Sequence, residues 1–282
     1  CCAAAADAPK RNGPKPPATA RIQHEMTGVT PAPAFYLTVT GTGVTPLGGA
    51  CQLQTASVGG TEPPPLPTCP ADSVKSGSLC VDKYEGSLWD IPPVDIGLIQ
   101  KVQDGTATLA DLTGGGATQV GTTGAPFNHA AIPATFPYDG NYTAPIYAVS
   151  IAGVLPSTSV SAFQAKAACE FSGKRLMSNA EWIAAGTGTP DTDTDDGATD
   201  CNTNAPGAGV NAPVNTGSRS GCVSTAGSSD MIGNVYEWTA DAFATAWFRG
   251  GSWSSGTFAG LFDAFQPAPS AQDSNIGFRC AR

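Results

Sequence analysis

Nine cysteines, set against only two histidines, constrain this chain more than any other feature. No two cysteines have the Cys-x2-Cys spacing typical of zinc sites, and His24 and His129 stand far apart in the chain. In a chain rich in Gly, Ser and Thr and poor in Lys, this pattern favours disulfides formed in an oxidising compartment. Nine is an odd number, so at least one cysteine has another fate.

The first residue offers that fate. Cys1 is followed by small residues and a Pro-rich stretch, which resembles a mature bacterial lipoprotein whose signal peptide has been removed. The alternative is that Cys1 or Cys2 is an ordinary thiol. Because a lipid on Cys1 would anchor the protein without spanning the membrane, we expect a secreted lipoprotein at the bacterial cell surface or outer membrane.

Composition bounds the fold and the partners. A length of 282 residues favours one large domain, or one domain plus an extension, and 41% hydrophobic residues suffice for a core. With 34 Gly and 24 Pro, much of the chain must be loop. The net charge of −9 argues against nucleic acid and against adsorption to an anionic membrane. No apolar run has the length of a membrane span.

Changes in amino-acid composition divide the chain into three parts. Residues 1–20 are rich in Ala, Pro and Lys, which is typical of a flexible tether. Residues 21–68 form a Thr/Pro-rich extension, and the alternation in residues 34–44 predicts a pair of strands. The extension either forms a small β module or adds strands to the next part. A Pro-rich stretch places the boundary near Cys69, so residues 69–282 form the main domain.

Two helices stand out in the main domain. Ser161 predicts the start of the first helix and Gly173 its end. Ser178 and Glu181 form a capping box at the start of the second helix, which Gly186 ends.

The other segments read as short strands and loops. Cys69 and Cys80 are spaced to close a hairpin, and Cys201 and Cys222 are expected to tie down a long polar loop. Residues 91–150 show little periodicity and are interpreted as a loop excursion. Short strands, two short helices and long loops predict an α+β domain whose loops carry the function.

The chain lacks the residues that several kinds of catalysis and ligand binding require. A Ser or Cys nucleophile needs a base within reach, and neither histidine lies in a recognisable core segment. No Gly-rich phosphate loop occurs. The acidic run at 191–197 departs from a calcium loop, since its glycine is one position late, and is interpreted as a solvated loop.

Five segments, in order, resemble one family: CVDKYEGS, AFQAKAACEFSGKRLMSNAEW, DMIGNVYEW, FRGGSW and NIGFRCA. This is the formylglycine-generating-enzyme/sulfatase-modifying-factor superfamily, which has a C-type-lectin-like fold. The resemblance covers Cys69 to Arg282. It implies a disulfide between Cys169 and Cys280.

The resemblance also bears on cofactors. The turn GNVYEW is similar to a calcium-holding turn of the family, with Asn234 and Glu237 as oxygen donors, and a hydrogen-bonded turn without metal is the alternative. Copper-dependent members carry two cysteines shortly after the GGSW motif, whereas this chain has none between Trp253 and Cys280. The His-rich motif of the iron-dependent members is also missing. We therefore expect structural calcium at most, no copper or iron, and no enzymatic activity.

A second branch of the family fits the chain end better. The C-terminal segment resembles the variable proteins of diversity-generating retroelements, in which reverse transcription rewrites adenine positions of a template. The resemblance implies an invariant frame of Arg249, Gly250, Gly251, Trp253, Gly277, Phe278 and Arg279. It implies a variable segment at about 243–275, whose ligand-binding residues are Phe243, Thr245, Ser254, Ser255, Phe258, Asp263, Phe265, Ala271, Asp273 and Ser274. All ten are reachable from an Asn codon, unlike Gln266 and Gln272.

Aromatic side chains beside small polar residues resemble an antibody paratope. We expect Phe258 and Phe265 to be exposed and Phe262 to be a core residue, while Trp253 and Phe278 are expected to form a buried frame. The sequence thus predicts a surface protein that binds a protein or glycan on another cell, host or phage. A lectin-like module with a fixed partner is the first alternative, and a divergent oxidase is the second.

Overall fold

The structure is a computed structural model that describes residues 68–121, 123–124, 127–128, 130–240 and 246–282, all within one compact unit. Several sequence predictions lie outside the described residues: the tether, the extension with its strand pair at 34–44, Cys1, His24, His129, Phe243 and Thr245. No helix of the described ranges is long and apolar enough to cross a membrane.

The described residues form short strands and four short helices. The strands are β1 Ser73–Ser76, β2 Leu79–Asp82, β3 Gly86–Asp90, β4 Thr118–Gly121, β5 Thr123–Gly124, β6 Phe127–Asn128, β7 Ala130–Ala131, β8 Tyr147–Ser150, β9 Arg175–Leu176, β10 Tyr236–Ala240, β11 Ala246–Arg249, β12 Ala264–Phe265, β13 Ile276–Phe278 and β14 Cys280–Ala281. The helices are α1 Ile96–Gln103, α2 Leu109–Gly114, α3 Ala162–Phe171 and α4 Asn179–Gly186, with a 3-10 turn, η1, at Gly256–Phe258. Long connections join these elements, as the Gly and Pro content predicts.

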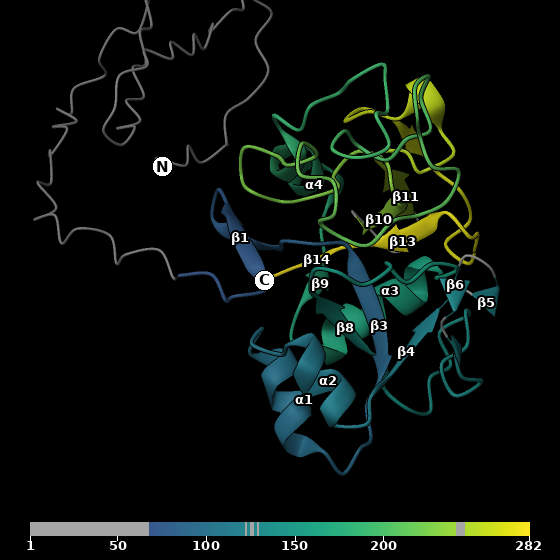
Figure 1. The fold of residues 1–282 in the computed structure, drawn as a ribbon. Helices are drawn as coiled ribbons and strands as arrows, with labels where there is room; N and C mark the ends of the chain where they lie inside the picture. Colours follow the sequence, from purple (N-terminus) through teal and green to yellow (C-terminus); the bar gives the residue numbers. More distant parts are fainter. Residues whose placement is uncertain (1–67, 122, 125–126, 129, 241–245) are drawn as a thin grey trace, which may run out of the picture. The chain divides into compact units, whose positions relative to one another are not determined.

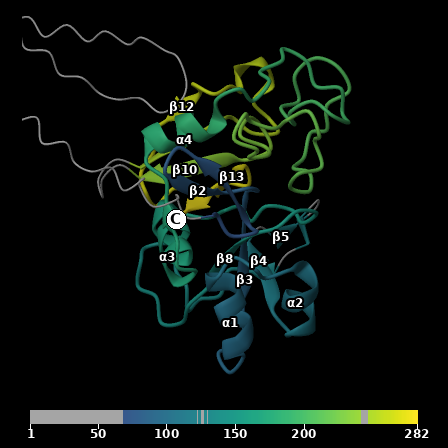
Figure 2. The same ribbon diagram turned by 90° about the vertical axis from the view of Figure 1, so that its left-hand side faces the viewer.

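Three four-stranded sheets organise the described unit. Their strand orders are β1-β2-β14-β9, β12-β11-β10-β13 and β7-β4-β3-β8, and β5 pairs with β6. Helices α1 and α2 lie at the end of the third sheet that faces away from β10 and β13, as Figures 1 and 2 both show. The central strand β10 pairs antiparallel with β11 and parallel with β13. The two ends of the C-terminal segment are therefore held by one strand.

Helices α3 and α4 begin where their caps predict. The Ser161 hydroxyl accepts the Gln164 N–H and the Gln164 side chain accepts the Ser161 N–H; Ser178 and Glu181 repeat this arrangement at α4. Such capping boxes satisfy N–H groups that have no partner within the helix. Gly173 follows α3 with φ +66°, a conformation that glycine adopts without cost.

The expectation of a loop excursion over residues 91–150 is wrong. That stretch contains α1, α2 and four strands as well as β8. Asp95 caps α1 by accepting the Leu98 N–H, and Thr108 forms a capping box with Asp111 at α2. Helices of eight and six residues span too few turns for a clear hydrophobic period, although the caps were visible in the sequence.

Disulfides and apolar packing hold these elements together. Cys69 bonds Cys80, Cys169 bonds Cys280, and Cys201 bonds Cys222, which are the pairs named from the sequence. The largest core cluster joins α3 to β10 and β13 through fully buried side chains that include Trp238, Phe278 and both cysteines of the second bond. The chain end is thus fastened to the first predicted helix.

Candidate functional site

The two glycines that open the frame are required by backbone geometry. Gly250 and Gly251 have φ angles of +91° and +80°. A Cβ on Gly250 would lie 2.7 Å from the Met231 carbonyl oxygen, and a Cβ on Gly251 would lie 2.6 Å from the Cα of Ala259. Any other residue would therefore be strained and would also clash. The pair sets the path by which the chain leaves β11.

At the other end of the frame, Gly277, Phe278 and Arg279 are buried. A Cβ on Gly277 would lie 2.8 Å from a methyl group of Val235. The Phe278 ring packs so closely that a Cβ on Gly86 would lie 2.6 Å from it. A side chain at Gly277 or Gly86 would therefore clash with these neighbours.

Arg279 lies in a fully buried polar network. Its guanidinium donates to the Glu237 carboxylate at 2.7 and 3.0 Å, to the Asp82 carbonyl at 3.0 Å and to the Ser229 carbonyl at 2.7 Å. The indole N–H of Trp182 donates to the other Glu237 oxygen at 2.7 Å. This set satisfies a charge that would be costly to bury alone.

Two further carboxylates share the network. Glu85 accepts the Val235 N–H at 3.0 Å and the Asn234 side-chain N–H. Burial, followed by the nearby charges of Asp230 and Glu237, raises the pKa of Glu85 well above its usual value. Burial likewise raises the pKa of Asp230 to about 6. Both carboxyl groups therefore take up a proton at a higher pH than an exposed carboxyl group does.

The turn expected to hold calcium does not fit the ion. Asn234 Oδ1 already accepts N–H groups from Asn202 at 3.0 Å and Val214 at 2.8 Å, and both Glu237 oxygens face N–H donors. Calcium takes six to eight oxygen ligands, and a guanidinium beside the carboxylate would repel it. Within the described ranges, no group of three or more His, Cys, Asp or Glu residues is placed to hold a metal. The geometry matches the hydrogen-bonded turn.

Two other expectations about buried groups need correction. Trp253 is only partly buried, although its backbone N–H donates to the carbonyl of the buried Asn234 at 2.9 Å. The acidic run at 191–197 is not simply solvated, since Asp195 is fully buried. Its carboxylate accepts the N–H groups of Gly197, Thr203 and Asn204 and so folds its own loop.

Between the two ends of the frame lies what we call the aromatic loop, residues 254–265. Phe258, Phe262 and Phe265 are 84%, 77% and 52% exposed. Exposure of Phe258 and Phe265 agrees with the sequence prediction, whereas the assignment of Phe262 to the core is wrong. Its neighbour Leu261 takes the inward position instead, packing against the cluster that contains Met231. Three exposed phenylalanines in eight residues form a feature that folding alone does not explain.

A polar cluster supports the aromatic loop from below. The Tyr236 hydroxyl donates to Asp263 at 3.0 Å and accepts from the Ser255 hydroxyl at 3.1 Å. Ser252 lies 3.1 Å from the Ser254 hydroxyl and 3.3 Å from the Ser255 hydroxyl. Burial raises the pKa of Tyr236 to about 12, so its hydroxyl stays protonated and able to donate. The cluster brings together Ser254, Ser255 and Asp263.

An aromatic ladder continues from the core to the surface. The ring centroids of Trp238 and Phe248 are 5.5 Å apart, those of Phe248 and Phe265 are 5.6 Å apart, and those of Tyr236 and Phe265 are 5.8 Å apart. Phe265 thus stands at the exposed end of a supported stack. Sequence reasoning missed Tyr236 and Phe248, although Tyr236 lies inside the quoted DMIGNVYEW motif.

The last expected variable residues follow the aromatic loop in the chain. Ala271 is half-buried against the main core, and Asp273 is exposed. Ser274 donates both its N–H and its hydroxyl to the Asp273 carboxylate. Gln272, which an Asn codon does not reach, donates to the Ser159 carbonyl at 2.7 Å.

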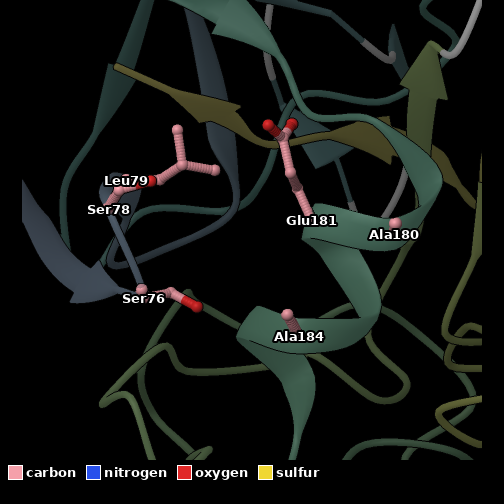
Figure 3. Close-up of a pocket in the computed structure, with 7 residues that line it drawn as sticks. Ser76, Ser78, Leu79, Ala180, Glu181 and Ala184 are labelled. Carbon is pink, nitrogen blue, oxygen red and sulfur yellow. The ribbon is translucent and has the colours of Figure 1, made fainter. Parts of the chain in front are cut away.

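A separate open cavity of about 300 Å³ lies between the β1–β2 turn and α4. Figure 3 shows Ser76, Ser78 and Leu79 on one side, facing Ala180, Glu181 and Ala184 of the helix on the other. Glu181 is engaged by Arg175 at 2.7 and 2.8 Å and caps α4. No residue expected to bind ligand lines this cavity.

Comparisons with known proteins give a family match for the C-terminal half of the chain. Residues 145–282 match the sulfatase-modifying factor enzyme 1-like domain family. No curated protein matches the chain. Over residues 145–282 this match agrees with the resemblance to the sulfatase-modifying-factor superfamily that the motifs carry. The described elements form an α+β fold with disulfides, as predicted.

Solved structures are similar at low identity. The Major Tropism Determinant M1 variant is 17% identical, with a TM-score of 0.43, over 76% of this chain and 54% of that chain. PvdO from Pseudomonas aeruginosa is 21% identical, with a TM-score of 0.44, over 72% and 80%. Treponema denticola variable protein 1 is 25% identical, with a TM-score of 0.31, over 38% and 47%. The chain spans about half the length of the M1 variant, and 37% of the I1 variant.

Proposed function

We propose that this protein, whose residues 145–282 carry a sulfatase-modifying factor enzyme 1-like domain, binds ligands through a diversified segment set in a fixed frame. The ligand is a protein or glycan on another cell, host or phage. A lipid on Cys1 holds the protein at the bacterial cell surface. The observation that carries the proposal is the exposure of Phe258, Phe262 and Phe265 between two buried, tightly packed ends.

Exposed aromatic area on a rigid support suits recognition. A phenylalanine side chain has two rotatable bonds, so it contributes large contact area at a small cost in conformational entropy. For Phe265, the ladder from Trp238 limits that motion further. The Asp263 carboxylate beside these rings accepts from Tyr236 through one oxygen and has further acceptor positions for a hydrogen bond with a partner.

The frame separates stability from recognition. The disulfide between Cys169 and Cys280 and the buried Arg279 hold the segment from outside it. Substitutions at exposed loop positions therefore change the surface with little effect on folding. This is the property that a segment needs if it is rewritten repeatedly.

Binding, rather than oxidation, agrees with the state of the cysteines. Every cysteine of the described ranges is in a disulfide, and the chain between Trp253 and Cys280 has none. A copper-dependent oxidase of this family type would need free thiolates there.

The proposal is tested first at the gene. We expect a near-copy of the stretch encoding Ala246 to Arg282 close by, differing where the copy has adenine, beside a reverse-transcriptase gene. Sister isolates should differ mainly at the ten variable positions named above. An unchanging segment with no such copy would leave a lectin-like module with a fixed partner.

Binding itself is tested on immobilised panels of glycans and proteins. For any member that binds, Phe258→Ser and Phe265→Ser should each weaken binding at least tenfold. Val94→Ser is the matched control, because Val94 is 88% exposed and lies next to α1 rather than in the aromatic loop. Equal losses from all three changes would contradict recognition by the aromatic loop.

A further inference from the structure

The loop before β8 carries a motif that the binding function does not use. Residues Asn141, Tyr142 and Thr143 form an Asn-x-Thr sequence, and no other Asn-x-Ser or Asn-x-Thr occurs in the chain. This is the acceptor sequence for N-linked glycosylation in exported proteins.

The structure presents this motif at the surface. Asn141 and Thr143 are both exposed, and they lie outside any helix or strand. The chain turns just before them: the Gly140 N–H donates to the Pro137 carbonyl, and the Asn141 N–H donates to the Asp139 carboxylate at 3.4 Å. N-linked glycans are bulky and lie at the surface, and an exposed turn has room for one.

The base of the loop is firmly attached, so a substituent at its tip need not disturb the fold. The ring of Tyr142 stacks on the buried Phe136 ring, with centroids 4.3 Å apart. The Ser161 hydroxyl donates to the Tyr138 carbonyl at 2.8 Å, and the Gln164 side chain donates to the Phe136 carbonyl at 2.7 Å. Tyr142, between the two exposed residues, is therefore the one that points inward.

We propose that Asn141 is a site of N-linked glycosylation, independently of the ligand-binding function. The donor is an oligosaccharide carried on a polyprenyl diphosphate. Nδ2 of Asn141 bonds to the anomeric carbon of the sugar as the bond from that carbon to the diphosphate oxygen breaks. The amide nitrogen loses one proton, the released polyprenyl diphosphate carries the electron pair away, and nothing is oxidised or reduced.

The glycan would stand near the end of the C-terminal segment. Gln164 connects the two regions, since it donates to Phe136 and accepts from Gln272 at 3.0 Å. The Ala162 N–H also donates to the Pro269 carbonyl at 2.9 Å. The base of the loop that carries Asn141 is thus joined through α3 to residues 269–272.

The test is the mass of the peptide that contains Asn141, in full-length protein purified from the organism that makes it. We expect this peptide to be heavier than its sequence by an oligosaccharide. The added mass should be lost in Asn141→Gln and in Thr143→Ala, and kept in Thr143→Ser, which retains the hydroxyl. Asn215→Gln is the matched control, because Asn215 is exposed but is followed by Thr-Gly and is not an acceptor.

Two results would overturn the proposal. One is an unmodified Asn141 peptide in folded protein from that organism. The other is an added mass that persists in both Asn141→Gln and Thr143→Ala. Misfolding is separated by melting temperature, which should be the same in Asn141→Gln as in the parent without glycan, since this side chain is exposed.

Discussion

Two groups of phenylalanines in this protein play opposite parts. Phe136 and Phe278 are fully buried and close the core around α3 and β10. Phe258 and Phe262 are more than three quarters exposed, although they have the same apolar surface to hide. Hydrophobic residues are usually inside, but an exposed cluster marks a surface kept for contact. The buried frame stabilises the fold, and the exposed aromatic loop contributes little to that stability, so its residues can change.

The disulfide that fastens the chain end should show the largest effect. Replacing Cys169 and Cys280 together by Ala opens a loop with a sequence separation of 111 residues. The chain-entropy account gives a loss of about 4–5 kcal/mol in the free energy of unfolding. Denaturant unfolding measures it. Replacing Cys69 and Cys80, which are 11 residues apart, should cost less, and the reverse order would break the assignment of the frame.

Phe278→Ala tests the comparison directly. It should cost about 3–5 kcal/mol, because it leaves a cavity in a packed core. Phe262→Ala should change the free energy of unfolding by no more than about 0.5 kcal/mol, since most of its surface is already in water. Urea unfolding of both variants gives the two numbers. Similar losses would mean that Phe262 belongs to the core after all.

The sequence predicted features that depend on neighbouring residues. The caps at Ser161 and Ser178 lie within one helical turn of their partners, so the pattern alone located α3 and α4. The position of Phe262 depended on which residue of a loop turns inward, and the sequence around it has no period that decides this. Here Leu261 turns inward.

The sequence predicted the two ends of the frame, and it predicted the aromatic loop between them only in part. The frame glycines Gly250 and Gly251 could be predicted from the sequence, because backbone positions with positive φ angles favour glycine. The polar cluster joins Tyr236 to Ser255 and Asp263, which are 19 and 27 residues further along the chain. Contacts across that distance are set by the pairing of β10 with β11 and β13, which the sequence did not reveal.

A pair of glycines extends the comparison to the backbone. Gly256 has φ +60° and open space around it, so Gly256→Ala should cost about 1–2 kcal/mol from conformation alone. Gly251→Ala has a similar conformational cost and also forces a contact with Ala259, adding about 1–3 kcal/mol. Thermal unfolding compares the two. Equal costs would show that the frame is not tightly packed at Gly251.

The buried acids beneath the frame should make stability depend on pH. The pKa of Asp230 rises from 3.8 to about 6 on folding, so the folded state holds this proton more tightly. Its stabilising contribution is complete below about pH 4 and is lost as the pH rises through about 6, at up to about 1.4 kcal/mol per pH unit. Asp82 has the same direction, and its pKa is also raised to about 6.

Asp230→Asn isolates this contribution. Asparagine keeps an oxygen for the Gly217 N–H and tolerates the φ of +59° at this position. The fall in stability between pH 4 and pH 7 should become shallower in this variant. A variant such as Asp273→Asn, at an exposed position, should leave the profile unchanged. An unaltered profile in Asp230→Asn would exclude Asp230 as the group that titrates.

Calcium should have the smallest effect of all. Asn234 and Glu237 form hydrogen bonds and an ion pair within the protein, and Arg279 supplies the positive charge that an ion would otherwise bring. Removing calcium with a chelator, or adding it back, should therefore leave the melting temperature unchanged. If calcium raises the melting temperature and Asn234→Ala abolishes that rise, the turn binds calcium after all. The stability of the frame would then depend on the calcium concentration around the protein. A frame held by Arg279 remains closed while the aromatic loop varies.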